Sequence, residues 1–284
     1  MSGTAEVIAP STLRRLAVEA ATAAGAEVRA TLRRQSPAEH VSDHDVKLRL
    51  DRACEQTILG MIRAVCPEHA VLSEESGFSP GTEPFLWIVD PLDGTVNFHH
   101  GIPFYCVSVA CYAVEEAEPR AGLRHPLPDG RFLGSGLAGV VYDPVRDELF
   151  SGTAGRGASL NEAPLRVPAA ARLQESLVAL SFGAREESID YIGAALPGFI
   201  RMARKVRSFG STALDMVQVA AGRVGAFVQM GTNLWDFAGA AVILAAAGGI
   251  VDVREYEPDR FRIIAAAAGL FDEVRRIAEG RPSR

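Results

Sequence analysis

The sequence predicts a mixed fold, in which an α+β first half is joined to an α/β-like second half. Two helical patterns open the chain, and four strand patterns follow between residues 70 and 143. From about residue 168 onward, apolar strands alternate with helices, as they do in α/β proteins. We expect an N-terminal half over 1–155 and a C-terminal half over 156–284, packed together as one compact unit.

In the first half, the helices are predicted by apolar residues that recur on one face. Ser11 is expected to cap the first helix, whose inward positions are Leu13, Leu16, Ala17, Ala20, Ala24 and Val28. The second helix is expected to follow Asp51, with Pro67 ending it. The strands are expected at 70–75, 85–90, 105–114 and 136–143. Residues 115–135 contain three prolines and several glycines, which indicates a long loop or an insertion.

In the second half, strand patterns occupy "SLVALSFG" and "AFVQMG", and helical patterns occupy "STALDMVQVAAG" and "DFAGAAVILAAAGG". The longest apolar run of the chain lies between Asp236 and Asp252. It is short for a membrane span and rich in alanine and glycine, so we expect a helix buried in the core.

Composition narrows the possible partners and the compartment. The net charge of −6, with scattered basic residues, argues against nucleic acid or an acidic membrane as a partner. The four cysteines have apolar neighbours and no CxxC spacing, so we expect buried free thiols in a reducing compartment. No signal peptide is evident at the N-terminus, because a basic region followed by an apolar one is missing there. We therefore expect a cytoplasmic protein.

The stretch "VDPLDGT" places two carboxylates, Asp90 and Asp93, at the end of an apolar strand. Haloacid-dehalogenase phosphatases carry DxDGT, whose first aspartate is the nucleophile, but here Pro91 stands two residues before Asp93. A covalent aspartyl-phosphate mechanism is therefore disfavoured. Converging carboxylates suit Mg²⁺, which prefers oxygen ligands, and Gly94 would let the backbone approach a phosphate. A capped turn with solvated acids explains this short motif equally well.

Further acidic residues lie at other element boundaries. Glu74 and Glu75 lie at the end of the strand expected at 70–75, and Asp236 opens the apolar helix of the second half. Asp45 and Asp51 precede the second helix. For Asp236, and for Asp45 and Asp51, a helix-capping role is the simpler interpretation.

The order of these motifs resembles the inositol monophosphatase family of magnesium-dependent, lithium-sensitive phosphatases over nearly the whole chain. The resemblance consists of "SEES", "WIVDPLDGTVNF", "PFYCVSVA", "GVVYDP", "GRGASLNEAPLRV", "RSFGSTALDM" and "LWDFAGAAVILAAAGG". The "TVNF" segment, with Asn97, favours the inositol-phosphatase branch over the nucleotide bisphosphate and histidinol-phosphate phosphatases. The resemblance implies a layered αβαβα sandwich, with the site between the two halves, and a homodimer.

The resemblance also implies a site for two or three Mg²⁺ ions, with Mn²⁺ as a substitute and Li⁺ as an inhibitor. Glu74, Asp90 and the carbonyl of Leu92 would hold the first ion. Asp90, Asp93 and Asp236 would hold the second. Most of these ligands belong to the first half, and Asp236 comes from the second.

Catalytic and substrate-binding roles are implied in the same way. Glu74 and Thr95 would orient and activate the water, and Asp51 would hydrogen-bond Thr95 from behind. The amides of Gly94 and Thr95 would bind phosphate. The residues expected around the substrate are Asp93, Gly94, Thr95, Thr212, Gln229 and Asp236.

The chain departs from the family pattern at several positions. Ser73 replaces a usual glycine, and His40 is the nearest residue to a usual lysine upstream of Asp45. The segment "VKLRL" replaces a more usual V-T-rich one before Asp51. Gln229 stands where a sugar-contacting glutamate is usual, so it keeps hydrogen-bonding capacity without the charge. Thr212 stands where a small alanine is common, which would alter the pocket wall.

Together these features predict a metal-dependent phosphoric monoester hydrolase that needs no covalent intermediate. Two metal ions can activate water, neutralise the phosphate and stabilise the leaving group. Inositol monophosphate is the leading candidate substrate. Fructose-1,6-bisphosphate, 3′-phosphoadenosine 5′-phosphate and histidinol phosphate are alternatives. A non-catalytic regulatory binding protein on the same scaffold is the competing class.

Overall fold

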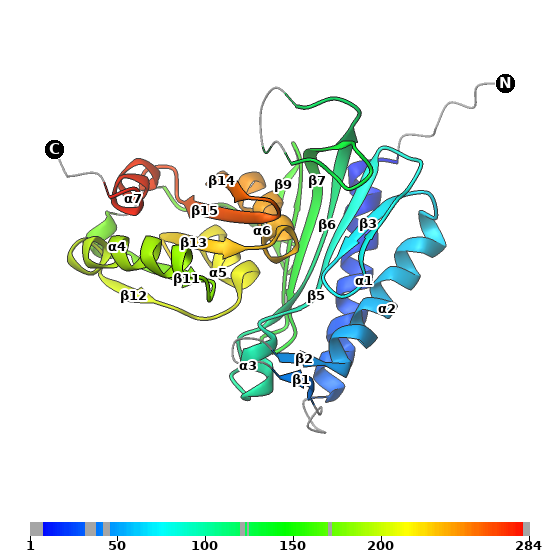
Figure 1. Cartoon of the computed structure of the whole chain (residues 1–284), viewed down its shortest axis with the longest axis horizontal. Helices are drawn as coiled ribbons and strands as arrows, with labels where there is room; N and C mark the ends of the chain where they lie inside the picture. Colours follow the sequence, from blue (N-terminus) through cyan, green and yellow to red (C-terminus); the bar gives the residue numbers. More distant parts are fainter. Residues whose placement is uncertain are drawn as a thin grey trace.

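The computed structural model describes residues 8–31, 38–41, 46–119, 123, 125–169 and 172–280, with the backbone alone for 38–41 and 46–48. In Figure 1 the chain forms five layers, in which helices and sheets alternate. This arrangement confirms the expected αβαβα sandwich. Asp45 lies outside the described residues, and so do the side chains of His40 and of most of "VKLRL".

The first two layers come from the N-terminal part of the chain. Helices α1 (Pro10–Thr31) and α2 (Arg49–Val65) cover one face of an eight-stranded sheet (Figure 1). The sheet contains β3 (Ala70–Ser73), β4 (Gly77–Ser79), β5 (Phe85–Asp93), β6 (Cys106–Glu115), β7 (Phe132–Asp143), β8 (Glu148–Thr153), β9 (Gly157–Leu160) and β10 (Ala163–Leu165). Its strand order is β10-β9-β8-β7-β6-β5-β3-β4. A separate hairpin pairs β1 (Ala38–Val41) with β2 (Val46–Leu48), and the short helix α3 (Thr95–His99) follows β5.

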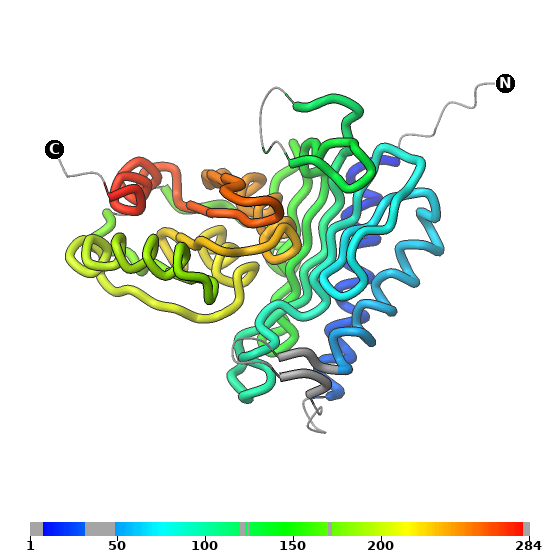
Figure 2. The backbone as a smooth tube through the Cα atoms, viewed as in Figure 1, coloured from blue at the N-terminus to red at the C-terminus, as the bar shows by residue number. Residues whose placement is uncertain are grey.

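The other three layers come from the C-terminal part. Helices α5 (Thr212–Ala220) and α6 (Leu234–Ala246) form the middle layer, and α4 (Glu186–Met202) and α7 (Phe271–Ala278) form the outer one. Between them lies a sheet of β11 (Leu177–Phe182), β12 (Lys205–Arg207), β13 (Ala226–Thr232), β14 (Ile250–Glu257) and β15 (Arg260–Ala266), after the short 3-10 helix η1 (Leu173–Glu175). Its order is β12-β11-β13-β15-β14, with only the first three strands parallel. Figure 2 shows that the strands of the two sheets run in different directions.

Two helices begin earlier than the sequence predicts. The amides of Thr12 and Leu13 bond to the carbonyl of Ala9, so α1 begins at Pro10 and the prediction of Ser11 as its cap was wrong. Proline suits the first helical position because its fixed φ is helical and its missing N–H has no acceptor there. The second helix was expected to follow Asp51, but α2 begins at Arg49, so Asp51 lies inside its first turn and is buried.

The apolar run of the second half is α6, a helix buried between the two sheets, as expected. Within the described ranges, no helix has the length and apolar character needed to span a bilayer. All four cysteines, Cys54, Cys66, Cys106 and Cys111, are free and buried, which agrees with the expectation of unpaired thiols.

The boundary between the two halves differs in detail from the expected one. Strands β9 and β10 still belong to the eight-stranded sheet, so that sheet extends to Leu165 rather than to residue 155. The stretch expected as a loop or insertion connects β6 to β7, and its described part includes one isolated bridge between Pro126 and Phe132.

Candidate metal centre

A β-bulge in β5 brings the two aspartates of "DPLD" to one face of the sheet. Asp90 pairs with Ser108 of β6, and Asp93 pairs with Cys106, so three steps along β5 match two along β6. Side chains of a regular strand alternate between faces, so residues three apart would point in opposite directions. The one extra residue restores the same direction for both carboxylates. Pro91 lies inside the bulge, where the missing backbone donor does least harm.

Core packing supports this change of direction along β5. Leu86 and Ile88 pack in the core between the two sheets, whereas Trp87 and Val89 pack in the core beneath α1 and α2. Beyond the bulge it is the even-numbered Leu92 that packs beneath the helices. Asp90 and Asp93 therefore both lie on the side that faces the second half, and both are buried.

The N-terminus of α5 holds Asp93 from the other half of the molecule. Its Oδ2 accepts hydrogen bonds from the Ser211 hydroxyl at 2.6 Å and from the Ala213 amide at 2.7 Å. Its Oδ1 accepts a weaker one from the Thr212 amide at 3.2 Å. The free amides of a helix N-terminus favour a carboxylate, so α5 fixes the orientation of Asp93.

The N-terminus of α6 orients Asp236 through a capping box with Asn233. Asp236 Oδ2 accepts hydrogen bonds from the Thr232 hydroxyl at 2.6 Å and from the Asn233 amide at 2.8 Å. Arg260 Nη1 donates to Asn233 Oδ1 at 2.9 Å and so steadies the cap. The capping role that was the simpler interpretation of Asp236 is real, and one carboxylate can serve both purposes.

Glu74 is positioned by a buried acid on α2 that the sequence analysis did not select. Glu55 Oε1 accepts hydrogen bonds from the hydroxyl of Ser73, and from the amide and hydroxyl of Ser76 at 3.1 and 3.2 Å. Glu74 lies between these two serines, and its own amide donates to the carbonyl of Val89 on β5. The serine that departs from the family glycine thus helps to anchor the end of β3. The available signal was a glutamate, Glu55, beside the apolar face of α2.

Burial raises the pKa values of all four acids, and repulsion from neighbouring acids raises those of Glu74, Asp90 and Asp93 further. Burial, with repulsion from Asp236 and Asp51, raises the pKa of Glu74 to about 8. Burial and the charge of Asp236 raise the pKa of Asp93 to about 7, against its hydrogen bonds from α5. Burial and the charges of Glu74, Asp93 and Asp236 raise the pKa of Asp90 well above the usual range, and burial also raises the pKa of Asp236. Such shifts mark a site that lacks enough positive charge.

The turn after the bulge places the other predicted groups. Gly94 caps α3 with φ +94°, and Thr95 is the first helical residue. The Thr95 hydroxyl donates to the carbonyl of Leu92 at 2.9 Å, the same carbonyl that the resemblance assigns to the first ion. A carbonyl has two lone pairs and accommodates both partners. The expected hydrogen bond between Asp51 and Thr95 stays a prediction, although Asp51 is close enough to Glu74 to raise the pKa of Glu74.

The two residues that depart from the family pattern contact each other. The Thr212 hydroxyl donates to Gln229 Oε1 at 2.8 Å, and both residues are buried. Thr212 lies on α5, next to the amides that hold Asp93, and Gln229 lies on β13. The hydroxyl therefore uses one acceptor position of the amide.

The four acids, Glu74, Asp90, Asp93 and Asp236, suit hard divalent cations by their donor chemistry, because every donor atom is an oxygen. Their oxygen atoms do not meet as closely as the ligands of one metal ion would. Of the chain that the structure describes, one group alone, His125, Glu255 and Asp259, has three donor atoms all within 4.8 Å of one another. The four acids interact across the space between β3, β5 and α6, where added positive charge would offset their repulsion.

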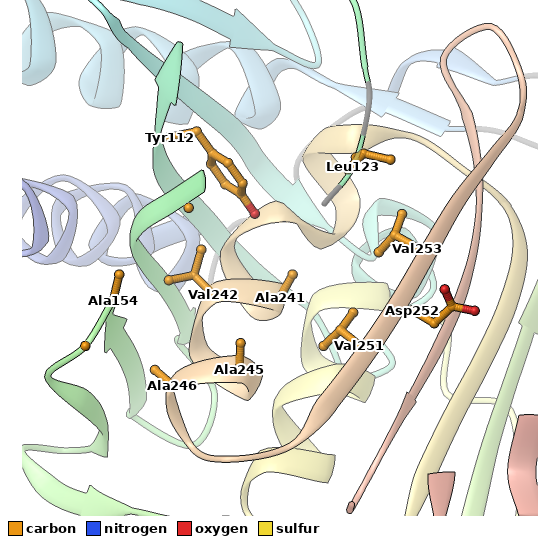
Figure 3. Close-up of a pocket in the computed structure, with 12 residues that line it drawn as sticks. Tyr112, Leu123, Ala154, Ala241, Val242, Ala245, Ala246, Val251, Asp252 and Val253 are labelled. Carbon is orange, nitrogen blue, oxygen red and sulfur yellow. The ribbon is translucent and has the colours of Figure 1, made fainter. Parts of the chain in front are cut away.

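None of these acids lines a separate pocket of about 510 Å³. Figure 3 shows its lining residues. Its walls are Tyr112, the later turns of α6 and residues 251–253 of β14, and most of them are apolar. Its one acid, Asp252, is paired with Arg262 at 2.5 Å. A phosphate ester needs several donors or cations, so this pocket does not suit one.

Comparisons with known proteins agree with the fold and the site. A sequence model of the inositol monophosphatase family matches residues 9–132 and 133–277. An inositol-1-monophosphatase of Synechocystis is 34% identical over 285 residues, covering 97% of this chain and 93% of that protein. Nus factor SuhB of Pseudomonas aeruginosa is 37% identical over 220 residues, 74% of each chain. The solved inositol monophosphatase of Anabaena superposes with a TM-score of 0.77 at 32% identity, covering 96% and 97% of the two chains.

The layered fold and the carboxylate site between its halves define a class, the metal-dependent phosphatases of this architecture. The chain belongs to the inositol monophosphatase family.

Proposed function

We propose that the protein is a magnesium-dependent phosphomonoesterase that hydrolyses a small phosphorylated polyol or sugar, with inositol monophosphate as the first candidate substrate. The observation that carries the proposal is the bulge in β5, which turns Asp90 and Asp93 to one face of the sheet. The raised pKa values of these acids and of Glu74 and Asp236 indicate a site poised for cations.

Each residue has a defined task in this proposal. Glu74, Asp90 and the Leu92 carbonyl would hold one ion, Asp90, Asp93 and Asp236 would hold another, and Glu74 would also contact a third, weaker one. Bound magnesium supplies charge neutralisation on the phosphate and lowers the pKa of water at the site.

The other site residues act on the water and the phosphate. Glu74 and Thr95 orient the attacking water, with Asp51 behind Thr95. The amides of Gly94 and Thr95 receive phosphate oxygens.

No side chain is needed as the nucleophile. Pro91 occupies the position of the attacking aspartate in DxDGT phosphatases. Cys106 lies 3.7 Å from Asp93 Oδ2, but burial and the charges of Asp93 and Asp90 raise the pKa of its thiol, so it stays protonated. Water is therefore the proposed nucleophile, and no covalent intermediate forms.

The Thr212–Gln229 pair leaves the precise substrate open. A glutamate would offer two charged acceptors to sugar hydroxyls, whereas Gln229 offers an amide with one acceptor position already used by Thr212. Inositol 1-phosphate, fructose-1,6-bisphosphate, 3′-phosphoadenosine 5′-phosphate and histidinol phosphate are the four substrates to compare by kcat/KM.

The test of catalysis is phosphate release from these four esters, with Mg²⁺ and with EDTA. We expect magnesium-dependent hydrolysis by the wild-type protein and a loss of at least about a thousandfold in Asp90→Asn, since Asp90 holds both ions. Asp272→Asn is the matched control, because the Asp272 side chain is 89% exposed on α7. Near-normal turnover by a folded Asp90→Asn variant would refute the metal assignment.

A regulatory binding protein is the second candidate, because relatives of 37% identity carry the name Nus factor SuhB. Magnesium-dependent turnover of any of the four esters supports the enzyme. Magnesium binding without turnover on any phosphomonoester would favour the regulator.

We also propose, from the resemblance, that Li⁺ inhibits the enzyme, that Mn²⁺ replaces Mg²⁺ and that the protein is a homodimer in the cytoplasm. Inhibition by Li⁺ is expected to require Asp93 and Asp236, which would share the second cation. Sedimentation of the purified chain tests the dimer.

A further inference from the structure

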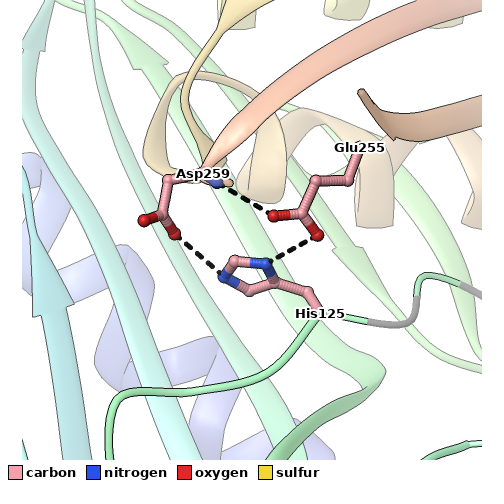
Figure 4. A group of neighbouring side chains, drawn as sticks. All are labelled: His125, Glu255 and Asp259. Carbon is pink, nitrogen blue, oxygen red and sulfur yellow. Dashed lines mark hydrogen bonds and ion pairs between the residues drawn. The ribbon is translucent and has the colours of Figure 1, made fainter. Parts of the chain in front are cut away.

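A second cluster of chemically active side chains lies between the β6–β7 connection and the β14–β15 hairpin. His125 contributes an imidazole whose side chain is only 4% exposed and whose ring packs edge-on against Phe261, at 5.3 Å between ring centres. Glu255 and Asp259 come from the end of β14 and from the hairpin turn (Figure 4). None of these residues belongs to the carboxylate centre.

Both ring nitrogens of His125 face a carboxylate. Nδ1 lies 3.1 Å from Glu255 Oε2, and Nε2 lies 3.5 Å from Asp259 Oδ1 (Figure 4). A neutral imidazole has one N–H, so it can donate to only one of these two oxygens. At the other contact, a nitrogen lone pair faces an oxygen lone pair, and the two repel. Some cation, a second proton or a metal ion, is needed to make both contacts favourable.

A second buried histidine with a carboxylate partner, His69, shows the contrast. His69 Nε2 lies 3.0 Å from Glu83, but its Nδ1 accepts a hydrogen bond from the Trp87 indole at 3.0 Å. One donor and one acceptor satisfy a neutral ring completely. His69 therefore has no nitrogen left for a cation, whereas His125 has one.

The cluster contains two potential metal ligands and a carboxylate that fixes the orientation of one of them. The Asp259 amide donates to Glu255 Oε1 at 2.9 Å, so Glu255 is fixed and directs its other oxygen at His125 Nδ1. Metal-bound histidines commonly donate their second N–H to a carboxylate in this way. The 3.5 Å between Nε2 and Asp259 Oδ1 is long for a hydrogen bond, but it suits two ligands of one ion with bonds of about 2.0–2.2 Å.

We propose that His125 Nε2 and Asp259 bind a divalent transition-metal ion such as Zn²⁺, with Glu255 as the residue that orients the imidazole. A nitrogen donor selects Zn²⁺, Ni²⁺ or Cu²⁺ over Mg²⁺, which prefers oxygen ligands. The Asp259 side chain is 80% exposed, so the ion can enter from solvent and keep water at its remaining positions. The site would fasten the β6–β7 connection to the β14–β15 hairpin.

The experiment measures Zn²⁺ binding by equilibrium dialysis of the full-length protein, with excess Mg²⁺ present to occupy the carboxylate centre. We expect His125→Gln and Asp259→Asn each to remove one Zn²⁺ per chain, and Glu255→Gln to weaken that site by about 10–100-fold. His69→Gln is the matched control and is expected to keep the ion. A thermal melt of each variant establishes that it is folded. If His125→Gln does not fold, Asp259→Asn still tests the site, because the Asp259 side chain is exposed.

Crystals soaked in ZnCl₂ place the ion independently of stoichiometry. An anomalous peak within about 2.2 Å of His125 Nε2 and beside Asp259 supports the proposal. Equal Zn²⁺ binding by the wild-type protein and both variants, or an imidazole that keeps both carboxylate contacts with no peak, overturns it. The cluster would then be an ion pair held by a second proton.

Discussion

Gly94 shows how one residue sets the geometry of the candidate site. Its φ of +94° lies in the left-handed region, and a Cβ there would lie 2.9 Å from the carbonyl of Phe104. Side chains are therefore excluded twice, by the backbone conformation and by the close approach of the 100–105 loop. The turn that separates Asp93 from α3 depends on this absence of a side chain.

Gly94→Ala is expected to cost more stability than Gly101→Ala, because both glycines have positive φ but only Gly94 is crowded. Gly101 has φ +71° with nothing within 4 Å of a built Cβ, so its cost is about 1–2 kcal/mol of backbone strain. For Gly94 we expect at least about 1 kcal/mol more, since a backbone carbonyl must move. Urea unfolding of both variants measures the difference, and equal losses would contradict the crowding argument.

Thr95→Ala tests the proposed role of the hydroxyl next to Gly94. The hydroxyl now donates to the Leu92 carbonyl, so its loss leaves a carbonyl that can still bind a cation. We expect kcat for inositol 1-phosphate to fall about 10²–10⁴-fold, the range for a proton-handling group, with KM little changed. A change confined to KM would place Thr95 in ground-state binding instead.

At the scale of elements, the starts of two helices fix two of the four acids of the centre. Asp93 receives the first amides of α5, and Asp236 forms the capping box of α6. Both helices pack between the two sheets, so each carboxylate is fixed by an element that cannot shift without disturbing the core.

Asn233→Ala is expected to destabilise the protein by about 1 kcal/mol, because α6 loses its cap and Arg260 loses its acceptor. It should also weaken Mg²⁺ binding, since Asp236 loses one restraint. Asn233→Ser keeps a capping oxygen and is expected to recover most of both losses. Calorimetric titration with Mg²⁺ provides the second readout. A variant with normal Mg²⁺ affinity would show that the cap does not position Asp236.

The elements also show what sequence patterns can and cannot reveal. The long helices and buried strands were predictable because their apolar periodicity is strong. Residues 186–202 were not assigned a helix, since Pro197 and two glycines obscure the pattern, yet tertiary packing holds α4 together. The bulge in β5 could not be read from "DPLD", because the register depends on β6, which lies across the sheet. Asp93 was therefore identified by its motif, and its partners on α5, Ser211 and Ala213, were not.

At the scale of the whole molecule, the candidate centre lies where the two halves meet. Glu74, Asp90 and Asp93 come from the eight-stranded side, and Asp236 comes from α6. Four acids gathered in one place, with Asp90 and Asp93 buried, oppose the packing of these halves whenever they are ionised together. Protons or cations at the centre relieve that repulsion, so pH and metal should control stability together.

In EDTA, the stability of the protein is expected to fall as pH rises from about 5 to 8. Burial and neighbouring acids raise the pKa of Glu74 to about 8 and that of Asp93 to about 7 in the folded protein, from usual values of 4.5 and 3.8. Between these limits the folded state holds more protons than the unfolded state, so raising the pH favours unfolding. Saturating Mg²⁺ should remove this decline, because ligation needs ionised carboxylates. Urea unfolding at pH 5 and pH 8 measures the change in the free energy of unfolding. An equal dependence of this free energy on pH with and without Mg²⁺ would contradict the prediction.

The extra residue of β5 makes the length of "DPLD" as important as its chemistry. Deleting Leu92 would leave every acid in the sequence and yet rotate Asp93 by one strand position, toward the apolar layer under α1 and α2. Its carboxylate would then lie on the same face of β5 as Trp87 and Val89 and lose the amides of α5. Deleting one residue from this segment should therefore lower the affinity for Mg²⁺ more than replacing Leu92 by another apolar residue does.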